Sequence, residues 1–173
     1  MNELEEVWAQ KLSQAIADAQ TSGRTDVADY LNLKAANDLL RQTSVRWLFD
    51  SITEIAAFAN RSRPQITIEN ENPHNFLHRN ANLVGSLIRL RLGVRCLSIE
   101  AGWTRTPADG FMRGGALAAA RLTHFGMQKQ NEEIILLRDS EDFPQWFAAE
   151  DDGKRVIFNS INLQKHFGLF TGE

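Results

Sequence analysis

The sequence predicts an α+β fold: about three N-terminal helices, a further helix, a mainly antiparallel sheet of four to five strands and a C-terminal helix. Up to about residue 60, apolar residues recur every three or four positions, which is typical of helices. After about residue 93, short apolar runs alternate with turn signals, which indicates strands. The chain has 173 residues, 43% of them apolar, enough for one domain with its own core. We therefore expect a single domain over 1–173, with a helical part over about 1–60 and a mixed part over about 64–173.

The first three helices are predicted from one-sided apolar stripes and their start signals. Residues 3–20 carry such a stripe, and the acidic residues of their first turn suit the positive end of a helix dipole. Thr25 is a good cap for a second helix. Thr43 or Ser44 begins a third, whose apolar period is the strongest in the chain. Pro64 ends it, because proline disfavours a helical residue before it.

The middle of the chain has two interpretations. Residues 65–71 alternate apolar and polar side chains, which indicates a short strand. From Pro73 to Leu92, apolar residues recur at helical spacing, and Gly93 suits the end of a helix. The stretch from Leu87 to Arg91 also alternates, which favours a strand instead. We prefer the helix, because its period extends back to Phe76.

The remaining elements are predicted from short apolar segments. Val94 to Ala101 reads as a central strand, which could pair in parallel with residues 65–71 across the intervening helix. Residues 116–125 favour a strand, although their alanines leave a helix open. Residues 134–137 are a continuous apolar run typical of a buried strand. Residues 145–150 and 154–159 flank an Asp-Gly pair and predict a hairpin. Ser160 caps a last helix.

The charges are distributed unevenly along the chain. Residues 1–72 hold 7 basic and 11 acidic side chains, residues 73–131 hold 8 and 2, and residues 132–173 hold 4 and 9. The middle third is thus an arginine-rich block between acidic segments, either an exposed surface for an anion or a block neutralised within the fold. Cys96 is the single cysteine, which excludes an internal disulfide. Without a secretory signal or a membrane-length apolar run, the expected location is cytoplasmic.

The loop from Gly102 to Gly115 is the strongest candidate for a functional segment, because connections this long are uncommon in compact domains. Its arginines could bind a carboxylate or phosphate through paired donors, and its aromatic residues could stack on a planar ligand. The loop matches no nucleotide-binding fingerprint, so no cofactor is predicted. The predicted ligand-binding residues are Trp103, Arg105, Asp109, Phe111 and Arg113.

A second set of residues could carry chemistry. His74 and His78 are four residues apart, so on a helix they share one face and are weak candidates for a metal site. Glu100 follows an apolar strand and is, with Asp109, a weak candidate for a general acid or base. Ordinary ion pairs or caps are the preferred explanation for each of these residues.

No motif identifies a reaction, so whether the protein is an enzyme stays open. The favoured hypothesis is a binding domain that holds an anionic small molecule or protein partner through its Arg/Gly-rich loop. The alternatives are a small hydrolase or metal-assisted enzyme that uses Glu100 with His74 and His78, and a structural subunit of a homo-oligomer. A nucleic-acid partner is disfavoured but stays open, since a helix-turn-helix resemblance in the second helix falls in an acidic segment. No membrane partner is expected.

Overall fold

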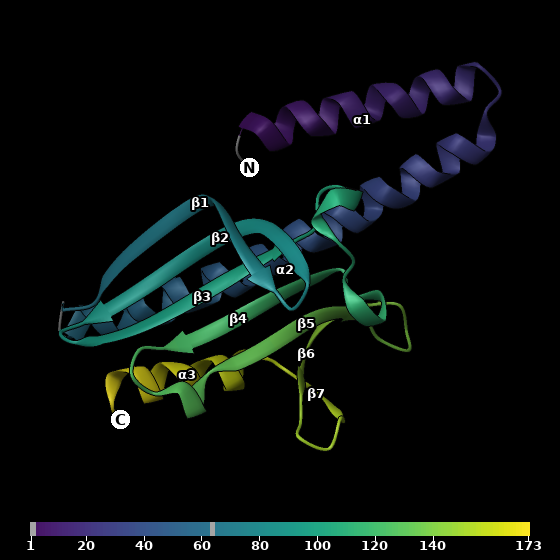
Figure 1. Ribbon diagram of the computed structural model, residues 1–173. Coiled ribbons are helices and arrows are strands. Elements are labelled where there is room, and N and C mark those ends of the chain that lie inside the picture. Colours follow the sequence, from purple (N-terminus) through teal and green to yellow (C-terminus); the bar gives the residue numbers. More distant parts are fainter. Residues whose placement is uncertain (1–2, 63–64) are drawn as a thin grey trace. The chain divides into compact units, whose positions relative to one another are not determined.

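The structure is a computed structural model that describes residues 3–62 and 65–173 (Figure 1). Within these residues the α+β class is confirmed, with three α-helices and one sheet of seven strands. The helices are α1 (Glu3–Thr21), α2 (Thr25–Ser62) and α3 (Ser160–Thr171). The strands are β1 (Thr67–His78), β2 (Ala81–Leu92), β3 (Arg95–Trp103), β4 (Ala118–His124), β5 (Glu132–Arg138), β6 (Pro144–Ala149) and β7 (Arg155–Ile157). The chain forms two compact units, Met1–Gln42 and Thr43–Glu173, and a single domain over 1–173 stays a prediction.

The first unit is a pair of helices joined by a tight turn. α1 ends at Thr21, and Gly23 adopts a φ of 73°, a left-handed conformation that glycine reaches without steric cost. α2 begins at Thr25, where the sequence predicts a helix start. Among residues 3–42, only Ala19 and Ala28, on either side of this turn, are buried. The two helices therefore share little core of their own.

The prediction of three N-terminal helices is wrong, because α2 runs unbroken through Thr43 and Ser44. Neither glycine nor proline occurs between residues 25 and 62, and serine and threonine are tolerated inside a helix that packing stabilises. That packing is visible at three fully buried positions one turn apart, Leu48, Ile52 and Ala56. α2 ends at Ser62, and Pro64, the expected helix stop, lies outside the described residues. Neither α2 nor another helix of the described residues is long and apolar enough to cross a membrane.

The sheet is a simple antiparallel meander in the order β1 to β7. The strands predicted near 94–101, 116–125, 134–137, 145–150 and 154–159 correspond to β3 to β7. The count of four to five strands is too low, and the parallel pairing is wrong, because β1 pairs antiparallel with β2 and not with β3. The strands that the prediction lacks are the end of β1 and all of β2, which residues 73–92 form.

Residues 73–92 form a β-hairpin and not a helix. They make up the end of β1 and all of β2, and the turn between them includes Arg79 with a φ of 55°. The apolar spacing resembled that of a helix because β2 is buried on both of its faces at Leu87 and Ile88, so neighbouring positions are both apolar. The alternation from Leu87 to Arg91 was therefore the correct signal. Gly93 ends no helix and lies in the turn between β2 and β3 with a φ of 59°.

One face of the sheet carries the main core. The second half of α2 and the whole of α3 lie on this side (Figure 1). The Nε1–H of Trp146 on β6 donates to the carbonyl oxygen of Ser44 on α2 at 3.2 Å. Five strand residues on this face are fully buried: Leu97, Ile99, Leu122, Ile134 and Leu136. Burial of such apolar surface is the dominant stabilising contribution to a fold of this kind.

The tip of the β1–β2 hairpin lies over the opposite face of the sheet. Figure 1 shows the end of β1 turning across β2 and β3. A Cβ atom on Gly85 would collide with the carbonyl oxygen of Ala101, so only glycine lets β2 approach β3 this closely. Beneath the tip is a small apolar cluster of Phe76, Ala81, Leu83 and Ala119, with Met112 and Ile135 packed against it. The tip thus brings β1 side chains close to β4 and β5.

A buried histidine pair joins α3 to the sheet. His124 on β4 and His166 on α3 are 1% and 5% exposed, and His124 Nε2 lies 2.9 Å from His166 Nδ1. His166 Nε2 lies 2.6 Å from a carboxylate oxygen of Glu132 on β5. Burial lowers the pKa of His124, and the neighbouring His166 lowers it further. α3 itself begins at the predicted Ser160, although its capping side chain is Asn159.

Candidate functional site

The loop between β3 and β4 is shaped by Asp109. It contains two short 3-10 turns, Pro107–Asp109 and Arg113–Gly115. Asp109 Oδ2 accepts hydrogen bonds from the backbone N–H groups of Thr106 (2.9 Å) and Arg105 (3.0 Å) and from the Thr106 hydroxyl (3.3 Å). The backbone hydrogen bonds of Thr106 and Arg105 lower the pKa of the Asp109 carboxyl. Asp109 therefore acts as a cap within the loop.

Trp103 is a buried support for Arg105. Trp103 is the last residue of β3 and is 5% exposed. The guanidinium of Arg105 lies 3.9 Å from the centroid of the Trp103 ring. The Nε–H and Nη2–H groups of Arg105 also donate to the carbonyl oxygen of Val84 on β2, at 3.4 and 3.2 Å. The arginine residue as a whole remains exposed. Stacking on a flat ring fixes the orientation of a guanidinium, which lowers the entropic cost of binding a carboxylate or phosphate.

Phe111 and Arg113 lie on the outer part of the loop. The side chain of Phe111 is 87% exposed, whereas its neighbour Met112 packs into the small apolar cluster under the hairpin tip. Arg113 is exposed as well. The loop is therefore anchored at Met112 while it presents an aromatic and a cationic side chain on either side of that anchor.

Two further arginines lie on segments that adjoin this loop. A Cβ atom on Gly110 would lie 3.0 Å from the carbonyl oxygen of Asn80, in the β1–β2 turn that also carries Arg79. A Cβ atom on Gly114 would lie 3.0 Å from Nη2 of Arg155, at the start of β7. We use the name arginine surface for four exposed residues from these three segments: Arg79, Arg105, Arg113 and Arg155.

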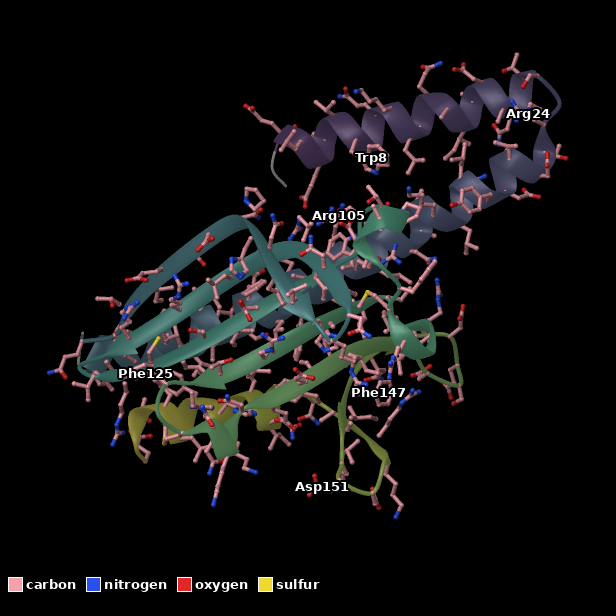
Figure 2. All side chains as sticks on the ribbon, viewed as in Figure 1. Trp8, Arg24, Arg105, Phe125, Phe147 and Asp151 are labelled. Atoms are coloured by element: carbon pink, nitrogen blue, oxygen red, sulfur yellow. The ribbon has the colours of Figure 1, made fainter. Side chains whose placement is uncertain are left out.

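The acidic residues near this region are directed elsewhere. Asp109, the single acid of residues 102–115, faces its own backbone. The acidic β6–β7 turn, marked by Asp151 in Figure 2, is well separated in that view from the labelled Arg105. Within that turn Asp152 pairs with Lys154 at 3.3 Å. Arg155 directly follows this acidic turn, whereas Arg79, Arg105 and Arg113 lie on the loop side, which gives that side a positive character.

The second set of predicted residues belongs to a polar network on the hairpin-covered face of the sheet. His74 Nε2 lies 2.8 Å from Glu100, and His74 Nδ1 lies 3.1 Å from Glu71. Arg121 on β4 joins Glu100 and Glu133, at 3.4 Å each, and its Nη2–H donates to the carbonyl oxygen of Leu77. The structure thus brings His74 and Glu100 together.

The pKa values of the two histidines of this network are shifted in opposite directions. Burial lowers the pKa of His74, but the hydrogen bonds to Glu100 and Glu71 outweigh it, so the pKa is raised above 6.5. Both ring nitrogens face carboxylates, which suits the imidazolium form because it alone can donate two hydrogen bonds. For His78, burial lowers the pKa, and Nε2 lies 3.5 Å from Glu133 without forming a hydrogen bond. The imidazolium form is therefore favoured at His74, and the neutral form is favoured at His78.

This network shows how the candidate chemical residues are arranged. His74 and His78 share a face of β1, as their spacing also requires on a strand, but they are linked through Arg121 and Glu133 and not through a common centre. Asp109 takes no part in the contacts of the network. Within residues 3–62 and 65–173, no three His, Cys, Asp or Glu side chains come together as a metal site. The network is best described as a set of ion pairs that fasten the hairpin tip to the sheet.

Arg79 and Arg121 lie in the arginine-rich block of residues 73–131, whereas Arg155 and Glu133 lie outside it and were not predicted. Arg79 and Arg155 adjoin the loop through the fold. Arg121 and Glu133 alternate with buried positions on β4 and β5, so strand alternation could have indicated that they face away from the main core. Comparisons of the chain with protein-family models, with curated proteins and with solved structures find no match.

Proposed function

We propose that this chain is a binding domain that holds an anionic ligand or an acidic partner on its arginine surface. The observation that carries the proposal is the stacked guanidinium of Arg105, which Trp103 and the Val84 carbonyl orient in the same loop as the exposed Phe111 and Arg113. An oriented guanidinium recognises the two oxygens of a carboxylate or phosphate in a bidentate manner. The exposed aromatic ring offers apolar contact to an organic portion of the same ligand.

Other arginines of the arginine-rich block, residues 73–131, are paired with carboxylates, which favours the loop as the binding site. Arg89, Arg91 and Arg121 form ion pairs with carboxylates of Glu71, Glu69 and Glu100 respectively. Their charges are largely balanced within the fold, whereas the Asp109 carboxylate of the loop accepts hydrogen bonds from its own backbone. An approaching anion is therefore attracted chiefly to the loop side of the block.

Titration calorimetry with three probes tests this function: inorganic pyrophosphate, a poly-glutamate peptide and a short single-stranded oligonucleotide. We expect binding of at least one probe, weakening as salt rises to about 0.3 M. The double variant Arg105→Ala/Arg113→Ala should bind that probe about tenfold more weakly, since losing about 1.4 kcal/mol of charge-assisted hydrogen bonding has that effect.

The matched control is Arg89→Ala/Arg91→Ala, which removes the same net charge from the same block at residues paired with Glu71 and Glu69. It should weaken binding by less than about twofold, because exposed pairs of this kind contribute little. Equal weakening by both double variants would indicate a response to net charge and refute the loop assignment. No binding of any probe at low salt would refute the function.

A hydrolytic centre is the second candidate function, favoured by the 2.8 Å contact between His74 and Glu100. In such a centre Glu100 would serve as the base and Arg121 would stabilise a developing negative charge. Assays with nitrophenyl phosphate and nitrophenyl acetate, repeated with Glu100→Gln, test it. Turnover that Glu100→Gln abolishes would support this candidate, and turnover that this variant leaves unchanged would exclude it.

A further inference from the structure

The helical unit at the start of the chain exposes an apolar surface that its own core does not use. Five large side chains in α1 and the first part of α2 are about half exposed or more: Leu4 (73%), Val7 (48%), Trp8 (50%), Tyr30 (65%) and Leu33 (58%). The two helices bury only Ala19 and Ala28 among residues 3–42. Amphipathic helices normally obtain their stability from packing of such apolar faces. This unit therefore lacks most of the packing that its sequence could provide.

These side chains form one patch and not isolated exposed residues. Leu4, Val7 and Trp8 lie three and four residues apart, so they share one face of α1. The ammonium group of Lys34 lies 5.1 Å from the ring centroid of Trp8, which places this part of α2 beside α1. Tyr30 precedes Lys34 by one helical turn and lies on the same side of α2. The apolar surface thus continues from α1 onto α2.

We propose that a second copy of this chain covers the patch, with the two helical units forming a four-helix bundle. A fully exposed large side chain offers about 150–250 Å² of surface. Multiplying this area by the exposed fraction of each of the five residues gives roughly 500 Å² for the patch. Two copies together would bury roughly 1,000 Å², which is at the lower end for specific interfaces. An exposed apolar patch of this size is also at the upper end for a soluble monomer. A dimer of micromolar affinity is the expected result.

The charges beside the patch favour a symmetric, antiparallel pairing of α1 with its copy. Glu3 and Lys11 are each four residues from Val7, on opposite sides of it along the helix. If a two-fold axis passes Val7, Glu3 of each copy lies beside Lys11 of the other, and the two Val7 side chains meet. A two-fold interface requires such self-complementarity. This pattern selects a second copy of the chain over an unrelated apolar partner.

Sedimentation equilibrium of the full chain tests the dimer. We expect a species of twice the 19.5 kDa chain mass above roughly 10 µM, and a monomer for Leu4→Glu/Trp8→Glu. The control is Val94→Glu, which places one glutamate on a 91% exposed apolar residue in the β2–β3 turn and should leave the dimer intact. A wild-type chain that stays monomeric to about 100 µM would overturn the proposal, and so would a dimer that persists in Leu4→Glu/Trp8→Glu.

Two further variants keep the test decisive if the double glutamate variant fails to fold. In a Cys96→Ser background, Val7→Cys should cross-link two chains under mild oxidation, whereas Ser13→Cys, on the opposite side of α1, should not. Lys11→Glu should weaken the dimer severalfold, and Glu3→Lys/Lys11→Glu should restore it. Equal cross-linking at positions 7 and 13, or no rescue by the charge exchange, would overturn the antiparallel arrangement.

Discussion

Glu100 and neighbouring carboxylates distinguish two parts of the arginine-rich block: arginines on strands that form ion pairs, and arginines in the loop. Its two carboxylate oxygens contact His74 and Arg121, and Glu71 and Glu69 pair with Arg89 and Arg91. Of the two interpretations that the sequence left open for the block, internal neutralisation applies to Arg89, Arg91 and Arg121. The loop arginines are exposed, and anion binding there is our proposal. A linear sequence could not separate these parts, because the partners of the strand arginines come from other strands.

The buried ring of His124 should make stability sensitive to acid. Burial lowers the pKa of His124 in the folded chain, so below the unfolded value of about 6.5 the unfolded chain binds more protons than the folded one. The free energy of unfolding should therefore fall as the pH decreases below about 6.5. Urea unfolding at about pH 7.5, 6.5 and 5.5 measures this fall.

The variant His124→Leu should reduce that dependence on pH. It removes the titrating ring but leaves Nδ1 of His166 without its 2.9 Å partner, so it should also lower stability by a similar amount at every pH. His78, whose pKa burial lowers as well, keeps its own contribution. If wild type and variant lose the same free energy between pH 7.5 and 5.5, His124 is not the acid-sensitive group.

At the scale of elements, the β1–β2 hairpin depends on Gly85. Because a Cβ atom there would collide with the carbonyl oxygen of Ala101, Gly85→Ala should destabilise the chain by about 3 kcal/mol. The matched control is Gly168→Ala in α3, where a Cβ atom would meet nothing nearer than 4.0 Å. Gly168→Ala should stabilise by about 0.5–1 kcal/mol, because alanine favours helix over glycine. Thermal unfolding of both variants measures the difference, and a neutral Gly85→Ala would contradict the close approach of β2 to β3.

The elements that the sequence predicts well are those with a clear turn or a clear period. The Asp-Gly turn marks the β6–β7 hairpin, and a helical period marks α3. β2 was misjudged because both Leu87 and Ile88 are buried, which interrupts the alternation that identifies a strand. The join at Thr43 and Ser44 was misjudged because capping residues also occur inside long helices when packing holds them.

The candidate site was predictable to a similar extent. Length, glycine content and arginines marked the loop, and the structure describes Arg105, Phe111 and Arg113 as exposed there. The roles of Trp103 and Asp109 within the loop depend on stacking and backbone contacts that no sequence pattern shows. Arg79 and Arg155 adjoin the loop only through the order of strands in the sheet.

At the scale of the whole molecule, the two proposals concern different units and can fail independently. The dimer depends on apolar residues of Met1–Gln42, and anion binding depends on arginines of Thr43–Glu173. A chain with Leu4→Glu/Trp8→Glu should therefore bind each anion with unchanged intrinsic affinity. A large loss of affinity in that variant would show that association and binding are coupled.

The most direct test of anion binding is a nuclear magnetic resonance titration that follows the arginine Nε–H signals as pyrophosphate is added. We predict saturable shifts for Arg105 and Arg113, with shifts for Arg91, which pairs with Glu69 at 3.1 Å, that are several times smaller. Shifts of equal size at all three arginines, or none at Arg105 and Arg113, would contradict the assignment of the loop as the binding site.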